Sequence, residues 1–74
     1  MIEELVYAVD IGGTKIDLGI VNHLGEIPVR QVISTPKSPL KTVNLIAAYY
    51  HHLLENLDQN QEITAVGIGT PNVR

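Results

Sequence analysis

A short apolar stretch near the N-terminus runs directly into an aspartate and two glycines and then resumes as a second apolar stretch. The segment reads YAVDIGGTKIDLG and spans residues 7–19. The run from Leu5 to Val9 is short, apolar and rich in strand-favouring residues, which is typical of a strand buried on both faces. A second strand is predicted from Ile16 to Val21. Because glycine allows a tight turn, the segment predicts two strands joined at Gly12 and Gly13.

A third strand is predicted directly after this hairpin. The tetrapeptide NHLG at 22–25 has turn chemistry, since Asn and Gly tolerate positive φ. The strand that follows runs from about Ile27 to Ser34. Pro28 interrupts it, and because proline cannot donate to a ladder it favours a strand start or an edge strand. The first three elements therefore predict an antiparallel meander.

A helix of about five turns is predicted after the meander, ending near residues 56–61. Ser38 and Pro39 have the types of a helix N-cap and of a proline in the first turn. The helix carries apolar residues that recur at a spacing of three or four, as expected for one buried face: Leu40, Val43, Ile46, Ala47, Tyr50, Leu53, Leu54 and Leu57.

The last predicted strand is ITAVGIG at 63–69, which has the composition of a buried, central strand. The order β-β-β-α-β predicts an α/β fold. A central strand needs a partner on its far side and helices over both faces of the sheet. We therefore expect residues 1–74 to be one incomplete domain at the beginning of a longer protein.

Length and composition limit the classes of function. The chain has 74 residues, no cysteine, 45% hydrophobic residues and a net charge of -3. It is therefore at most one domain, without a disulfide framework or a thiolate metal site. No basic stripe favours nucleic-acid binding. Neither a secretory signal nor an apolar run long enough for a membrane span is recognisable, so we expect a cytoplasmic protein.

The DIGGTK segment combines the groups that a metal-bound polyphosphate needs. Asp10 follows a predicted buried strand, where its carboxylate can hold a divalent cation. The N–H groups of Gly12 and Gly13 can converge on an anion, while Thr14 adds a hydroxyl and Lys15 a charge at the rim. ATP with Mg²⁺ is the expected ligand. The pattern is neither a P-loop nor a dinucleotide fingerprint, because the glycine turn joins two strands.

Plainer interpretations of these residues exist. On its own, a strand–Gly-Gly–strand segment is most often a simple hairpin. Asp17 lies on the same strand face as Lys15, where it either looks into a ligand cleft or, as is commoner, is simply exposed. His51 and His52 are neighbours on the predicted helix and diverge too far to grip one metal.

The stretch AVDIGGTKIDLGIVNHLGEI resembles the first phosphate motif of the actin-like ATPase superfamily, most closely that of the ROK family of sugar kinases, open reading frames and repressors. The resemblance implies an RNase-H-like domain paired with a second such domain across a cleft for ATP and a sugar. It implies a metal-associated role for Asp10 and a phosphate loop formed by Gly12, Gly13 and Thr14. Lys15 matches a position that is commonly Lys or Asn.

The same resemblance extends to the C-terminal stretch AVGIGTPNVR. It implies that Pro71 and Asn72 lie in a loop near the sugar cleft, although Asn72 stands where many members have Gly. Nothing matches the family's catalytic aspartate, its adenosine-binding segment or its zinc cluster. Zinc is therefore expected only in a missing part of the parent protein.

These observations lead to one expectation and two alternatives. We expect the N-terminal portion of a ROK-type hexose kinase, such as a glucokinase or fructokinase, that carries the Mg-ATP phosphate loop and is inactive alone. The alternatives are a sugar-responsive transcriptional regulator of the same family and a truncated, inactive remnant. Homo-oligomerisation is also possible, because an open sheet edge favours association.

Overall fold

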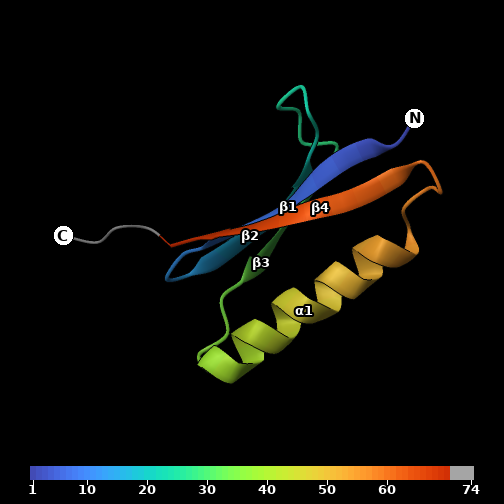
Figure 1. Cartoon of the computed structure of the whole chain (residues 1–74). Helices are drawn as coiled ribbons and strands as arrows, with labels where there is room; N and C mark the ends of the chain where they lie inside the picture. The colour runs from blue at the N-terminus through green and yellow to red at the C-terminus, as the bar shows by residue number, and fades with distance from the viewer. Residues whose placement is uncertain (71–74) are drawn as a thin grey trace.

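The computed structural model describes residues 1–70 as a four-stranded sheet with one helix against one of its faces (Figure 1). The elements follow in the order β1 (Glu3–Ile11), β2 (Lys15–Val21), β3 (Val29–Ser34), α1 (Pro39–Glu55) and β4 (Gln61–Gly69). The strand order in the sheet is β3-β2-β1-β4. The two pairs within β1, β2 and β3 are antiparallel, and β4 is parallel to β1. The predicted element order and the initial meander are confirmed.

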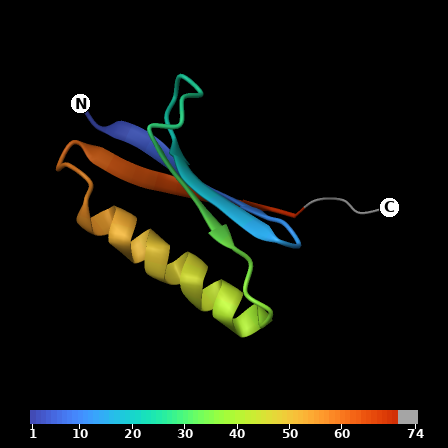
Figure 2. The ribbon, with the colours of Figure 1, turned by 180° about the vertical axis from the view of Figure 1, so that it is seen from behind.

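The turn chemistry of the sequence is also confirmed. β3 begins at Val29, directly after Pro28, and it lies at one edge of the sheet, as proline predicted. The turn before it projects beyond the end of the sheet (Figure 2). Gly25 adopts a positive φ of 80° there. The side-chain oxygen of Asn22 accepts hydrogen bonds from the N–H groups of Leu24 at 3.0 Å and Glu26 at 2.9 Å.

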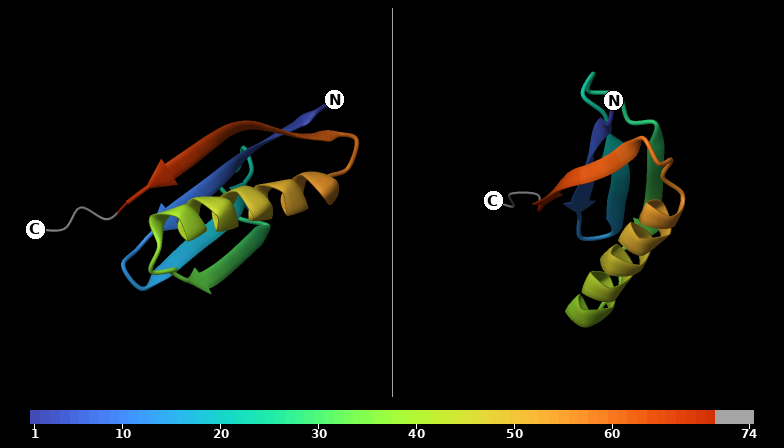
Figure 3. Two further views of the ribbon diagram at one scale, coloured as in Figure 1. Left: turned by 90° about the horizontal axis from the view of Figure 1, so that it is seen from below. Right: turned by 45° about the vertical axis from the view of Figure 1, so that its right-hand side comes forward.

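α1 covers a single face of the sheet (Figure 3), and the core lies between the two. Its buried side chains are Leu5, Tyr7, Val9, Ile16, Leu18, Ile20 and Leu53. Burial alternates along β1, because successive side chains of a strand point to opposite faces. The prediction that this strand is buried on both faces is therefore wrong for the residues that the structure describes.

The start of α1 is as predicted, but its buried face is narrower than its apolar stripe. Ser38 caps the helix and its hydroxyl oxygen accepts the N–H of Lys41 at 3.3 Å. Tyr50 and Leu53 pack on the core as expected. Leu40 and Val43, which were predicted to be buried, are exposed. Val43 lines a groove beside Val66 and Ile68 of β4 that no other described element covers, so only part of the apolar stripe is buried.

β4 differs most from its prediction. It was expected to be a buried, central strand, but it forms the sheet edge opposite β3. Val66 is 51% and Ile68 is 60% exposed, although both lie on the side of the sheet that carries α1. The reason is that α1 stands away from this edge and no other described element covers it. Among the described residues, no helix is long and apolar enough to cross a membrane.

Candidate functional site

The DIGGTK residues form the end of the β1–β2 hairpin and the turn that closes it. Ile11 and Ile16 are the last paired residues in the ladder. Beyond them the N–H of Gly12 donates to the carbonyl oxygen of Lys15 at 2.9 Å. This contact leaves Gly13 and Thr14 as the two residues at the tip. Lys15 starts β2 and is exposed, so the structure brings all the predicted phosphate-loop residues together at one end of the sheet.

The two glycines of the turn have different surroundings. A Cβ atom at Gly12 would approach the carbonyl oxygen of Lys15 to 2.9 Å, closer than side chains tolerate. A Cβ atom at Gly13 would meet nothing within 4 Å. Gly12 is thus required by the turn itself. The missing side chain of Gly13 leaves open space on the outside of the turn, where a ligand can approach the backbone.

One backbone N–H group of the turn is used inside the hairpin, and two others have no acceptor in the described chain. Gly12 uses its N–H inside the hairpin, so the expected convergence of the Gly12 and Gly13 donors on one anion is wrong for Gly12. Within residues 1–70, the N–H groups of Gly13 and Thr14 donate to no backbone or side-chain acceptor. Two successive N–H groups of this kind are suited to bind an anion such as a phosphate oxygen.

Asp10 lies on β1, two residues before the turn and on the face of the sheet opposite α1. Its side chain is exposed. Within residues 1–70 it takes part in no side-chain hydrogen bond or ion pair. Mg²⁺ in proteins is held by one or two carboxylates together with phosphates and waters. A free carboxylate two residues before a turn with free N–H donors therefore fits a metal-bound phosphate, and Asp10 is the residue that would hold the metal.

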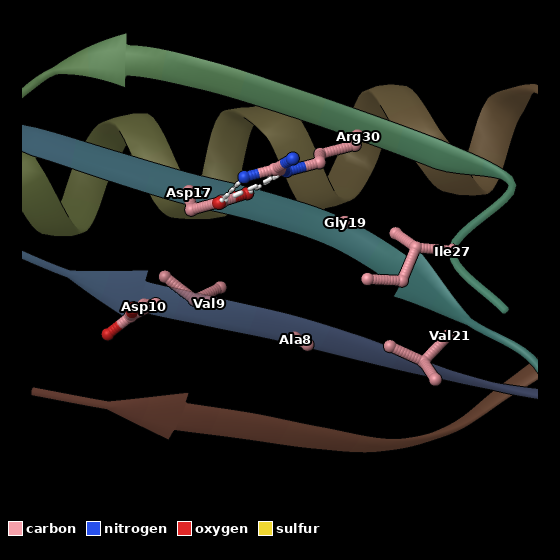
Figure 4. A pocket seen from close by; sticks show the side chains of 8 residues that line it. All are labelled: Ala8, Val9, Asp10, Asp17, Gly19, Val21, Ile27 and Arg30. Atoms are coloured by element: carbon pink, nitrogen blue, oxygen red, sulfur yellow. Dashed lines mark hydrogen bonds and ion pairs between the residues drawn. The ribbon is translucent and has the colours of Figure 1, made fainter. Parts of the chain in front are cut away.

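A second carboxylate, Asp17, stands directly opposite Asp10 in the β1–β2 ladder. Arg30 on β3 binds it through two groups: Nε donates to the carboxylate oxygens at 3.0 and 3.1 Å, and Nη2 donates to Oδ2. These hydrogen bonds and the charge of Arg30 hold the pKa of Asp17 below its ordinary value. The pair is exposed, and the carboxylate of Asp10 points away from it (Figure 4).

Asp10, Asp17 and Arg30 border a pocket on this face of the sheet (Figure 4). The pocket has a volume of about 410 Å³, and small residues such as Ala8 and Gly19 form its floor. Asp17 had been given two interpretations, an exposed strand residue and one that faces a cleft. The structure places it at the rim of this pocket with its charge already paired.

The remaining predicted residues lie away from the turn. Pro71 and Asn72, predicted to form a loop near a sugar, lie outside the described residues. His51 and His52 are exposed on α1, where they lie beside Tyr50 and Tyr49 respectively. Among residues 1–70, no group of three or more His, Cys, Asp or Glu side chains gathers as a metal site.

Sequence reasoning missed Thr35, which contacts the turn from the start of the β3–α1 loop. Its hydroxyl donates to the carbonyl oxygen of Gly12 at 2.8 Å, and its N–H donates to that of Thr14 at 2.9 Å. The signal for it was indirect. Lys15 pairs with Ser34 in the sheet, so the residue after Ser34 must lie beside the turn.

A mixed four-stranded sheet with one helix and a glycine turn between its first two strands defines part of an actin-like ATPase fold. The profile of the ROK family matches residues 6–73. The chain belongs to the ROK family.

Relatives of known name are consistent with membership of this family. Glucokinases of Streptomyces coelicolor and Streptomyces lividans are each 42% identical to the chain over 65 residues, which are 88% of this chain and 19% of each relative. The crystal structure of a ROK family glucokinase from Streptomyces griseus in complex with glucose and AMPPNP matches with a TM-score of 0.73 and 36% identity, over 89% of this chain and 20% of that one.

A second solved structure is a protein of Listeria monocytogenes whose suggested activity is that of an N-acetylmannosamine kinase. It matches with a TM-score of 0.63 and 28% identity, over 92% of this chain and 21% of that chain. The chain thus spans about a fifth of the length of the relatives that it matches.

Proposed function

We propose that this chain is the N-terminal part of a sugar kinase and that its β1–β2 turn binds the phosphates of ATP with Mg²⁺. The observation that carries the proposal is the open space at Gly13, in a turn with two free N–H groups that begins two residues after the exposed Asp10. The relatives support it, because three are named glucokinases and one of these three was crystallised with glucose and AMPPNP, an analogue of ATP. These names favour a kinase over a transcriptional regulator.

Each residue of the turn has a separate role in this proposal. The N–H groups of Gly13 and Thr14 donate to phosphate oxygens, and the hydroxyl of Thr14 and the ammonium of Lys15 are close enough in sequence to assist. Asp10 holds Mg²⁺ directly or through its waters. Bound Mg²⁺ neutralises the charge that develops on the phosphates during transfer. Gly12 keeps the turn closed.

Catalysis requires more than this turn provides. Phosphoryl transfer depends on positioning of both substrates and on electrostatic stabilisation by several groups at once. Asp10 is assigned to the metal, and no other residue here matches the family's base for the sugar hydroxyl. We therefore propose that residues 1–74 form one incomplete domain, which binds Mg-ATP but does not phosphorylate a sugar. The exposed β4 edge and the coverage of the relatives support this.

The test is a titration of the 74-residue chain with Mg-ATP, followed by amide NMR. Shifts that need Mg²⁺ and centre on Gly13 and Thr14 are expected, and Asp10→Asn should abolish their dependence on Mg²⁺. Gly13→Ala should weaken binding about tenfold, which corresponds to about 1.4 kcal/mol, because a methyl group then occupies the space of the phosphate.

Gly67→Ala is the matched control. Gly67 lies on β4, and a Cβ atom there also meets nothing within 4 Å, so both substitutions add a methyl group in open space. Gly67→Ala should bind Mg-ATP like the wild type. Equal affinities of Gly13→Ala and Gly67→Ala, or no binding by a chain that circular dichroism shows to be folded, would contradict the proposal.

A further inference from the structure

Among the described residues outside the β1–β2 hairpin, Thr35 is the one that forms hydrogen bonds to both ends of the hairpin's turn. The residue lies in the loop between β3 and α1 and is half-buried. It is 23 positions from Gly12 in the sequence, yet its hydroxyl donates to the Gly12 carbonyl oxygen at 2.8 Å. Its N–H donates to the Thr14 carbonyl oxygen at 2.9 Å. The two acceptors lie on either side of Gly13.

Because of peptide geometry, these two contacts determine how the turn is oriented. In a planar trans peptide the carbonyl group and the N–H of the next residue point in opposite directions, and no peptide among the described residues is cis. A Gly12 carbonyl group directed at Thr35 therefore directs the Gly13 N–H away from Thr35. That N–H is one of the two free donors of the candidate site.

The turn also lacks the backbone conformation that usually closes a two-residue hairpin. Such hairpins commonly use type I′ or II′ turns, which need positive φ at one or both central residues. Neither Gly13 nor Thr14 has positive φ. The backbone twist of this turn therefore does not match the twist of its strands in the usual way. Hydrogen bonds from outside the hairpin then contribute more to fixing the conformation of the turn.

We propose that Thr35 is a positioning residue that holds the Gly12–Thr14 turn with the Gly13 N–H directed at the bound phosphate. This inference rests on the proposed function for the identity of its ligand. The hydroxyl is the decisive group, because any residue except proline supplies the N–H. A side chain of threonine shape without the hydroxyl should therefore leave the Thr14 contact in place and release the Gly12 carbonyl group.

The experiment compares Thr35→Val with Thr35→Ser in the 74-residue chain. Valine keeps the shape of threonine and removes the hydroxyl, whereas serine keeps the hydroxyl. Mg-ATP affinity is measured by NMR titration and stability by urea unfolding. Thr35→Val should weaken Mg-ATP binding about fivefold, the effect expected for one lost hydrogen bond. Thr35→Ser should bind close to the wild type.

Backbone ¹⁵N relaxation without nucleotide gives a second readout. Gly13 and Thr14 should become more mobile in Thr35→Val and remain ordered in Thr35→Ser. A merely structural threonine would change the unfolding midpoint and leave both the affinity of the folded chain and the order of the turn unchanged. Equal affinity and equal relaxation in the two variants would overturn the proposal.

The two proposals can fail separately. If the folded wild type does not bind Mg-ATP, the proposed function fails, and the relaxation comparison still decides whether Thr35 orders the turn. If Thr35→Val does not fold, exchange of the Thr35 hydroxyl proton with water in the wild type decides. A slowly exchanging hydroxyl proton supports the bond to the Gly12 carbonyl oxygen and hence the anchoring of the turn, and a hydroxyl proton that exchanges as fast as an exposed one overturns it.

Discussion

Tyr7 on β1 donates its phenolic O–H to the main-chain carbonyl oxygen of Ile46 on α1 at 2.9 Å. The tyrosine is only 1% exposed and is among the largest buried side chains of the described chain. Its ring lies 5.4 Å from that of Tyr50 and 6.2 Å from that of Tyr49, measured between centroids. This hydrogen bond therefore joins the sheet to its helix through the middle of the core.

The first prediction concerns the stability of the chain at high pH. Burial, and to a lesser degree the nearby Tyr49, raises the pKa of Tyr7 from 10.0 to about 12. Between these values the unfolded chain loses the phenolic proton and the folded chain keeps it. Unfolding is then favoured by deprotonation, so the contribution of Tyr7 is complete below pH 10 and is lost as the pH rises toward 12. The expected loss is about 2–3 kcal/mol.

Tyr7→Phe tests this prediction by urea unfolding at neutral and alkaline pH. At neutral pH the variant should lose about 1 kcal/mol, because one hydrogen bond is removed. Its further loss of stability at high pH should be smaller than that of the wild type. Tyr50→Phe is the control, since it changes a neighbouring ring and leaves the Tyr7 hydroxyl in place. The same alkaline loss in wild type and Tyr7→Phe would contradict the prediction.

Features that depend on neighbouring residues in the sequence were predicted well. Pro28 precedes an edge strand because it has no N–H to donate to a neighbouring strand. Ser38 caps α1 because its side chain accepts an N–H from the first turn of the same helix. The glycine turn was also found, and only its donors differ. Gly12 uses its N–H for the hairpin, a detail that depends on the register of β1 and β2.

Features that depend on distant contacts could not be predicted in the same way. Thr35 reaches the turn only because β2 and β3 pair in one particular register. Val66 and Ile68 gave β4 the composition of a buried strand, but composition does not say which element covers a strand. In the described residues these side chains are exposed, because no described element covers them.

The second prediction concerns the charges on the open face of the sheet. Asp10 and Asp17 occupy directly opposite positions in the β1–β2 ladder, and like charges in such positions repel. Arg30 compensates Asp17 and lowers the pKa of that carboxyl below 3.8. Arg30→Gln should therefore raise the pKa of Asp17, measured by the NMR titration of its side-chain carboxyl carbon. It should also weaken Mg-ATP binding, because the uncompensated carboxylate of Asp17 adds a negative charge on the side of the sheet that carries Asp10 and repels the phosphates.

The pH dependence of stability follows from the same pair. A carboxyl whose pKa is lowered by folding stabilises the protein above its unfolded pKa of about 3.8, and this contribution is lost as the pH falls through the lower, folded value. Arg30→Gln should lose less stability at acid pH than the wild type does. The difference in stability should be small, because the pair is exposed. Lys37→Gln removes the same charge from the exposed loop before α1 and should leave the Asp17 titration unchanged. A shift of Asp17 in both variants would indicate a general charge effect.

The third prediction concerns the groove between α1 and β4. It has a volume of about 470 Å³ and an almost entirely apolar lining, which includes Val43 of the helix with Val66 and Ile68 of the strand. The outer edge of β4 has no neighbouring strand among the described residues. An open edge beside an exposed apolar groove favours association with another chain. The 74-residue chain should therefore self-associate as its concentration rises.

Ile68→Lys should reduce this association, because it places a charge in the groove and at the sheet edge. Sedimentation equilibrium over a range of concentrations measures the effect, and circular dichroism checks that the variant is folded. Leu24→Lys is the matched control: Leu24 is also an exposed apolar residue, but it lies in the turn between β2 and β3, away from β4. Association that weakens equally in both variants would show that general surface hydrophobicity, rather than the groove beside β4, holds the copies together.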